Sequence, residues 1–110
     1  MKFKKITGLK VVVSYPDPLF KMLVIEEVDA DGFYVYVGGK RVNLAVYKTE
    51  ARPWNVVEVT TGFRVGSYRP TKDDAIRTTL IQVKAMDSAL FWESIEGGMK
   101  TRKEIEARVV

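Results

Sequence analysis

The chain has 110 residues, contains neither cysteine nor histidine, and carries a net charge of +4 because 18 lysine and arginine residues outnumber 14 acidic residues. The two missing residue types exclude disulfide frameworks, cysteine-ligated metal centres and every catalytic site that uses a thiolate or an imidazole. At about 100 to 200 residues per domain, this length predicts a single domain, 1–110, with a core of its own.

The beginning of the chain carries several lysines, as a secretory signal does. Thr7, Gly8 and Lys10 interrupt its apolar run, however, and no small-residue cleavage site follows. No apolar run approaches the about 20 residues that cross a bilayer as a helix. We therefore expect a cytoplasmic protein with no membrane partner.

Residues typical of β-strands dominate the first 70 positions. Turn-forming residues divide this part into short segments, which predict strands near 3–13, 20–28, 33–37, 41–48, 54–60 and 63–68. The strand connections are expected at 15–18, 29–32, 38–39 and 61–62. Of these, Gly38-Gly39 and Thr61-Gly62 predict tight hairpins, because glycine tolerates the positive φ that such turns require.

The predicted hairpin around Gly38-Gly39 has two different faces. Phe33, Val35 and Val37 alternate with Tyr34 and Tyr36 along its first strand. Since successive strand residues point to opposite faces, one face should be aliphatic and the other polar and aromatic.

The pattern becomes helical after Pro70. Thr71 is expected to cap a long helix within 71–96, with Asp73 and Asp74 in its first turn near the positive end of the helix dipole. Gly97-Gly98 should end this helix, and a short terminal helix should occupy 101–110. The predicted fold is α+β: an antiparallel, curved and partly barrel-like sheet of five or six strands, packed by one long helix and followed by a short one.

The long predicted helix has a second apolar stripe opposite the one that should face the sheet. Ile81 and Trp92 belong to this stripe together with Ala85 and Ala89. Either the terminal helix folds back onto the two alanines, or another protein or a second copy of the chain covers the stripe. Tryptophan is common at binding hot spots, so the candidate protein-interface residues are Phe91, Trp92, Ile95 and Ile81.

Basic residues are concentrated in two parts of the chain. Residues 1–10 hold four lysines and no acid, and residues 51–85 hold six bases against three acids. Such clusters are typical both of a polyanion-binding face and of an ordinary solvated surface. The candidate nucleic-acid contacts are Lys2, Lys4, Lys5, Lys40, Arg41, Arg64, Arg69 and Lys72.

Three tyrosines of the predicted sheet, Tyr34, Tyr36 and Tyr47, could present a base-stacking surface beside Lys40 and Arg41. A sheet face covered by a helix would have the same pattern. The sequence leaves both arrangements open.

Known catalytic and ligand-binding motifs fit this chain poorly. The segment 38–41 lacks the first glycine and the hydroxyl residue of a phosphate-binding loop, and 29–32 lacks the later ligands of a calcium loop. We predict no catalytic residue, no cofactor and no metal site, and therefore a protein that is not an enzyme.

Residues 54–76 follow the order strand, Thr-Gly turn, strand and threonine-capped helix. This order resembles small accessory proteins of bacteriophages and mobile elements, whose sheet-plus-helix domains include DNA-binding types. The resemblance covers about a fifth of the chain and implies no site residue.

Two functions follow as expectations. The first is a non-enzymatic interaction module, such as a phage-type accessory or inhibitor protein, that binds another protein or forms a homodimer. The alternative is a nucleic-acid-binding protein that uses the basic N-terminus and the basic region from the second hairpin to the helix.

Overall fold

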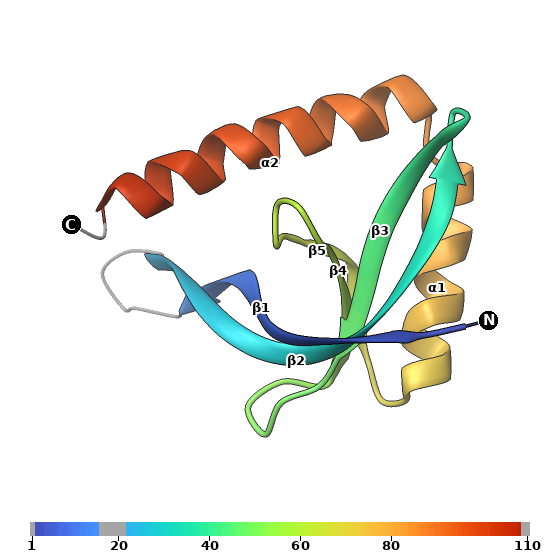
Figure 1. Cartoon of the computed structure of the whole chain (residues 1–110). Helices are drawn as coiled ribbons and strands as arrows, with labels where there is room; N and C mark the ends of the chain where they lie inside the picture. Colours follow the sequence, from blue (N-terminus) through green and yellow to red (C-terminus); the bar gives the residue numbers. More distant parts are fainter. Residues whose placement is uncertain (1, 16–21, 109–110) are drawn as a thin grey trace.

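A computed structural model of the chain describes residues 2–15 and 22–108 and has an α+β architecture (Figure 1). Five antiparallel strands form one sheet in chain order, followed by two helices: β1 Lys4–Tyr15, β2 Met22–Val37, β3 Lys40–Tyr47, β4 Trp54–Glu58, β5 Arg64–Arg69, α1 Lys72–Ala85 and α2 Ser88–Arg108. The α+β class and the antiparallel sheet are confirmed. Within the described residues the sheet is not closed, because β1 and β5 form its edges, and the partly barrel-like shape stays a prediction.

The longest strand, β2, pairs with two neighbours in succession. Its residues 22–32 pair with β1, and residues 31–37 pair with β3. The prediction of two strands joined by a connection at 29–32 is therefore wrong. Asp29 and Asp31 suggested a turn, but each has a partner on another element. Asp29 Oδ1 accepts a hydrogen bond from Gly8 N at 3.2 Å, and Asp31 Oδ2 pairs with Lys72 Nζ at 2.8 Å. The connection predicted at 15–18 falls largely on residues outside the described part.

Gly32 marks the place where β2 changes partner. It lies opposite Lys4 of β1 and Ala45 of β3. A Cβ atom at this position would stand 2.8 Å from Ile6 Cδ1 and 3.2 Å from the Lys4 carbonyl oxygen. The glycine therefore allows the start of β1 to lie close against β2.

Both faces of the sheet carry an apolar cluster. On one face, residues such as Phe33 pack with Ile76 of α1 and Phe91 of α2. On the other face, Val11 of β1 and Val57 of β4 belong to a second cluster that no helix enters. The bend of β2 visible in Figure 1 allows one sheet to bury residues on both sides.

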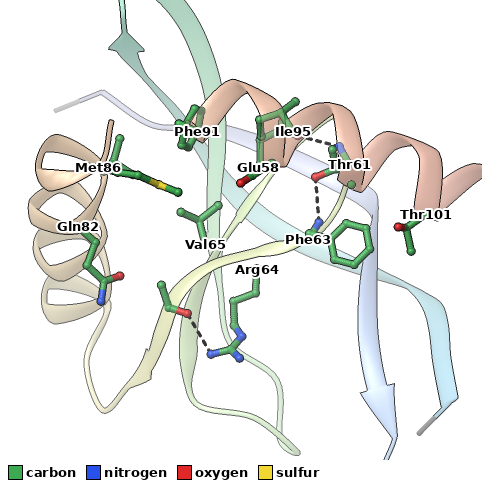
Figure 2. A pocket seen from close by; sticks show the side chains of 14 residues that line it. Glu58, Thr61, Phe63, Arg64, Val65, Gln82, Met86, Phe91, Ile95 and Thr101 are labelled. Carbon is green, nitrogen blue, oxygen red and sulfur yellow. Dashed lines mark hydrogen bonds between the residues drawn. The ribbon is translucent and has the colours of Figure 1, made fainter. Parts of the chain in front are cut away.

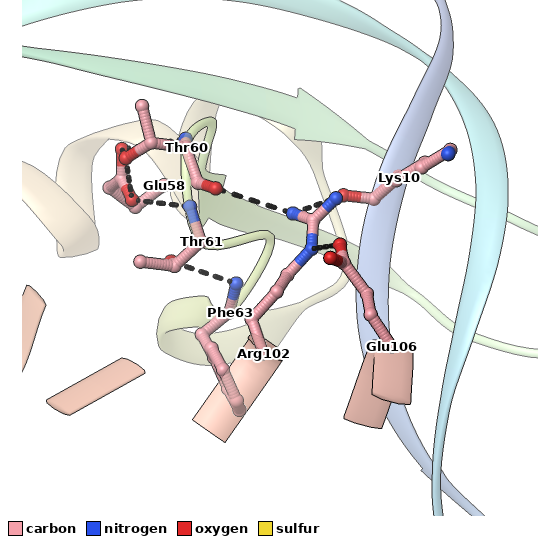
Figure 3. A network of polar contacts seen from close by, with 7 residues as sticks. All are labelled: Lys10, Glu58, Thr60, Thr61, Phe63, Arg102 and Glu106. Carbon is pink, nitrogen blue, oxygen red and sulfur yellow. Dashed lines mark hydrogen bonds and ion pairs between the residues drawn. The ribbon is translucent and has the colours of Figure 1, made fainter. Parts of the chain in front are cut away.

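The strand predicted at 54–60 ends earlier, at Glu58, because its side chain folds the chain into a turn (Figure 3). The Glu58 carboxylate, only 4% exposed, accepts hydrogen bonds from Thr60 N at 2.9 Å, Thr61 N at 2.8 Å and Thr60 Oγ1 at 2.6 Å. These hydrogen bonds replace those that the carboxylate would make to water, and so they reduce the free-energy cost of burying it.

The same turn touches the opposite edge of the sheet. Gly62 has a φ of 74°, and a Cβ there would stand 2.5 Å from the Lys10 carbonyl oxygen. Val12 N donates a hydrogen bond to Gly62 O at 2.8 Å. Contact of the β4–β5 turn with β1 thus requires a residue without a side chain.

The helical region differs from the predicted one. Thr71 caps α1 as expected, since its side chain accepts a hydrogen bond from Asp74 N at 3.2 Å. However, α1 ends at Ala85 and α2 begins at Ser88, so the single long helix is wrong. Asp87 causes the new start, because its Oδ1 accepts hydrogen bonds from Ala89 N and Leu90 N at 2.9 and 3.2 Å.

The predicted break at Gly97-Gly98 is also wrong, because both glycines lie inside α2. A Cβ on Gly98 would stand 3.3 Å from side-chain atoms of Thr61 and Phe63. Packing against the β4–β5 turn therefore explains a glycine at position 98, which the sequence alone had assigned to a helix end. The short helix predicted at 101–110 is the C-terminal part of α2 as far as Arg108, and residues 109 and 110 lie outside the described part.

Contacts near both ends hold α2 over the sheet. Near its start, Trp92 Nε1 donates a hydrogen bond to Val37 O at 3.0 Å. Near its end, Ile105 is buried and the Arg102 guanidinium lies 3.3 Å from Thr60 O and 3.5 Å from Lys10 O (Figure 3). The helix therefore spans the sheet from the β2–β3 hairpin to the β4–β5 turn.

Replacing the capping residue of α2 should destabilise the protein. D87A removes the acceptor for Ala89 N and Leu90 N and should lower the free energy of unfolding by about 1 kcal/mol. D87N is the matched control, since asparagine caps helices about as well as aspartate. Denaturant unfolding followed by circular dichroism measures both variants. Equal stability of D87A and the wild type would contradict this account of the helix boundary.

Candidate functional site

A groove lined by lysine, arginine and aromatic side chains lies where the start of β1 crosses β2 and β3. Its volume is about 710 Å³. We call it the basic groove and define it by Lys2, Phe3, Lys4, Lys5, Tyr34, Arg41 and Asn43. It contains four positive charges and no acidic lining residue, so it is a positively charged surface feature.

The N-terminal segment supplies one wall of the basic groove. Lys4 and Lys5 begin β1 and pair with Gly32 and Asp31 of β2, respectively. Both lysine side chains are exposed. The pairing thus places the lysine-rich end of the chain beside the β2–β3 hairpin, which is distant from it in the sequence.

The hairpin supplies an aromatic and hydrogen-bonding wall. Tyr34 is opposite Asn43, and Tyr36 is opposite Arg41. Strand alternation places these four side chains on the face away from the helix-covered Phe33. Tyr34 is 53% exposed and Tyr36 is 66% exposed, so their rings are accessible.

The Arg41 side chain is held in place at the basic groove. Its guanidinium carbon lies 4.1 Å from the centre of the Tyr34 ring, and its Nε donates a hydrogen bond to Asn43 Oδ1 at 3.0 Å. Tyr34 and Tyr36 meet edge to face, with ring centres 5.9 Å apart. A cation and two aromatic rings are therefore fixed together before any ligand arrives.

Lys72 contacts Phe3 of the basic groove but does not line the groove itself. Its Nζ pairs with Asp31 and lies 4.2 Å from the centre of the Phe3 ring. Phe3 in turn meets Phe33 edge to face at 6.0 Å. Lys72 is thus a positioning residue for Phe3, which is partly exposed at the groove.

The other predicted cationic contacts lie elsewhere. Lys40 is in the β2–β3 hairpin, where its Nζ lies 5.5 Å from the centre of the Trp92 ring. Arg64 and Arg69 belong to β5, which does not line the basic groove. Arg64 donates a hydrogen bond to Gly66 O at 3.0 Å and stacks on Tyr68 at 4.3 Å. The structure therefore brings together Lys2, Lys4, Lys5 and Arg41, with Lys72 beside them.

Tyr47 does not join the exposed tyrosines. It is 3% exposed and belongs to the apolar cluster on the face without helices. Burial raises the pKa of its hydroxyl above the usual value, and the nearby Tyr68 adds to this effect. Of the three tyrosines, Tyr34 and Tyr36 are therefore exposed, and Tyr34 lines the basic groove together with Phe3.

The predicted protein-interface residues do not form one exposed surface. Phe91 is 4% exposed in the core, and Trp92 packs against it and binds Val37 O. Ile95 is half-buried, whereas Ile81 of α1 is 62% exposed. Ala85 and Ala89 remain exposed, so of the two alternatives for the second stripe the fold-back of a terminal helix is not formed.

A second cavity lies on the helix-covered face, between β4, β5, α1 and α2 (Figure 2). Its volume is about 420 Å³. We call it the apolar pocket and define it by Glu58, Phe63, Val65, Met86, Phe91 and Ile95. It shares no lining residue with the basic groove.

Within residues 2–15 and 22–108, no group of three or more acidic side chains is placed to hold a metal ion. Neither α1 nor α2 has the combination of length and apolarity that a helix needs to span a membrane.

Comparison of the chain with protein-family models, with curated proteins and with solved structures finds no match.

Proposed function

We propose that this protein binds single-stranded nucleic acid in the basic groove. The observation that carries the proposal is the placement of four cationic side chains and two accessible aromatic rings, those of Phe3 and Tyr34, along one groove. Lysine and arginine neutralise phosphates, and aromatic rings stack on unpaired bases. A surface that combines both features matches the chemistry of a nucleic-acid strand.

Stacking favours a single strand over a duplex. The flat faces of bases are occupied by neighbouring bases in a duplex but are available in a single strand. Tyr34 projects from the sheet and Phe3 from its N-terminal extension, and both line the basic groove. The proposed ligand therefore follows the lysines with its phosphates and places bases against these rings.

The arrangement supports binding with little sequence preference. Arg41 already uses its Nε on Asn43 and its flat face on Tyr34. Direct recognition of base edges needs several free donors and acceptors at fixed positions. Backbone contacts and stacking dominate in the basic groove, and both tolerate any base.

The protein-binding function that the sequence placed first has weaker support. Two of its four anchor residues, Phe91 and Trp92, already form contacts within the chain. Binding hot spots are side chains that fill pockets of the partner. Nucleic-acid binding therefore agrees better with the positions of the predicted residues.

Neutralising the groove should weaken binding and reduce its dependence on salt. We expect K4Q/K5Q/R41Q to lose at least about tenfold in affinity for a single-stranded oligonucleotide at about 50 mM salt. The slope of log affinity against log salt should become smaller by about 2, since each phosphate contact to a single strand contributes about 0.7. Fluorescence anisotropy between about 50 and 200 mM salt measures both quantities.

The matched control for the charge change is K100Q/K103Q/R108Q, which removes three exposed charges from α2. This control should bind within about twofold of the wild type if the groove is the site. Equal losses in both triple variants would show that net charge alone governs binding and would contradict the proposed site.

Stacking on Tyr34 can be tested separately from charge. Y34A should weaken single-strand binding by about 1 to 3 kcal/mol, because it removes a stacking ring and the surface on which Arg41 rests. Y34F keeps the ring and should bind like the wild type. Anisotropy titrations of the three proteins give the comparison. An affinity of Y34A equal to that of Y34F would contradict a stacking role.

A further inference from the structure

The Arg41 guanidinium is fixed by two contacts but keeps its outer edge free. Its Nε donates a hydrogen bond to Asn43 Oδ1 at 3.0 Å, and its carbon lies 4.1 Å from the centre of the Tyr34 ring. Neither terminal nitrogen, Nη1 or Nη2, has a hydrogen-bond or ion-pair partner among residues 2–15 and 22–108. Their N–H donors therefore lie ready at the end of an exposed side chain.

The contact with Asn43 determines how Arg41 can bind an anion. A guanidinium holds an oxyanion bidentately either through Nε and one terminal nitrogen or through both terminal nitrogens. Because Asn43 already occupies Nε, the second arrangement is the one that Arg41 can use. Nη1 and Nη2 match two oxygens of one phosphate, so this edge can hold a phosphodiester through both of its unesterified oxygens.

The lysines of the basic groove differ from Arg41 in this respect. Lys2, Lys4 and Lys5 are exposed, and no ion pair fixes their ammonium groups within the described part of the chain. An ammonium group on a flexible stem is a point charge, which can follow a phosphate without fixing its position. Arg41 loses less freedom on binding, because its side chain is already held.

We propose that Arg41 holds one phosphate of the bound strand bidentately through Nη1 and Nη2 and so fixes the position of the strand in the basic groove. This inference rests on the proposed binding of single-stranded nucleic acid. The held phosphate lies beside the Tyr34 ring, because the guanidinium that binds it rests on that ring. Asn43 is then a positioning residue for Arg41, and the lysines contact neighbouring phosphates.

An exchange of arginine for lysine separates the shape of the group from its charge. R41K keeps the positive charge but removes the planar donor pair, and it should weaken binding of oligothymidylate at least about fivefold at about 50 mM salt. The slope of log affinity against log salt should stay close to the wild-type slope, because one phosphate is still neutralised. The reciprocal control K4R/K5R should bind within about twofold of the wild type. Fluorescence anisotropy measures the three proteins, and circular dichroism checks that they are folded.

Nuclear magnetic resonance of the wild-type protein tests the same contact without a substitution. A guanidinium held at both terminal nitrogens no longer rotates freely about its bonds to Cζ. The Nη–H signals of Arg41 should therefore become resolved when oligothymidylate is added. Their absence from spectra of R41K assigns them to this residue.

The outcomes distinguish this inference from the proposed function. Suppose that K4Q/K5Q/R41Q loses affinity as expected, but R41K binds within about twofold of the wild type or the Arg41 Nη–H signals stay unresolved. The bidentate contact is then wrong, and the basic groove remains the binding site. A wild-type protein that binds no oligothymidylate would overturn both the proposed function and the role of Arg41.

Discussion

The arrangement of this protein depends on one strand that pairs with two neighbours in turn. β2 pairs with β1 up to Gly32 and with β3 from Asp31 onwards. At this junction the absence of a side chain on Gly32 allows β1 to approach closely. The pairing brings Lys4 and Lys5 beside the hairpin that carries Tyr34 and Arg41. Because successive strand residues point to opposite faces, a shift of β1 by one residue would exchange the faces of Lys4 and Lys5 and move Ile6 out of its apolar cluster.

The opposite face depends on the turn at Glu58 in the same way. The buried carboxylate shapes the β4–β5 turn, the turn contacts β1, and Arg102 of α2 reaches the carbonyl oxygens of both. Because α2 is held at its two ends, a cavity remains beneath its middle. The basic groove and the apolar pocket thus lie on different parts of one sheet and share no lining residue.

Local signals in the sequence predicted local structure well. The hairpin turn at Gly38-Gly39 and the cap at Thr71 form where expected, because a few neighbouring residues determine them. Asp29 to Gly32 and Gly97-Gly98 misled the prediction, since their partners lie far away in the sequence. The same limit applies to the site. Tyr34, Tyr36 and Arg41 were recognisable on one hairpin face, whereas Phe3 and Asn43 were missed and the lysines could be placed beside them only by strand pairing.

The central claim is that bases stack on the aromatic side chains of the basic groove. Ultraviolet cross-linking of single-stranded oligothymidylate to the wild-type protein, followed by mass mapping of the modified peptides, tests it most directly. We predict cross-linked nucleotides on Phe3 or Tyr34, with a yield that falls as salt is raised. Cross-links confined to β5 or α2, or none at any salt concentration, would contradict it.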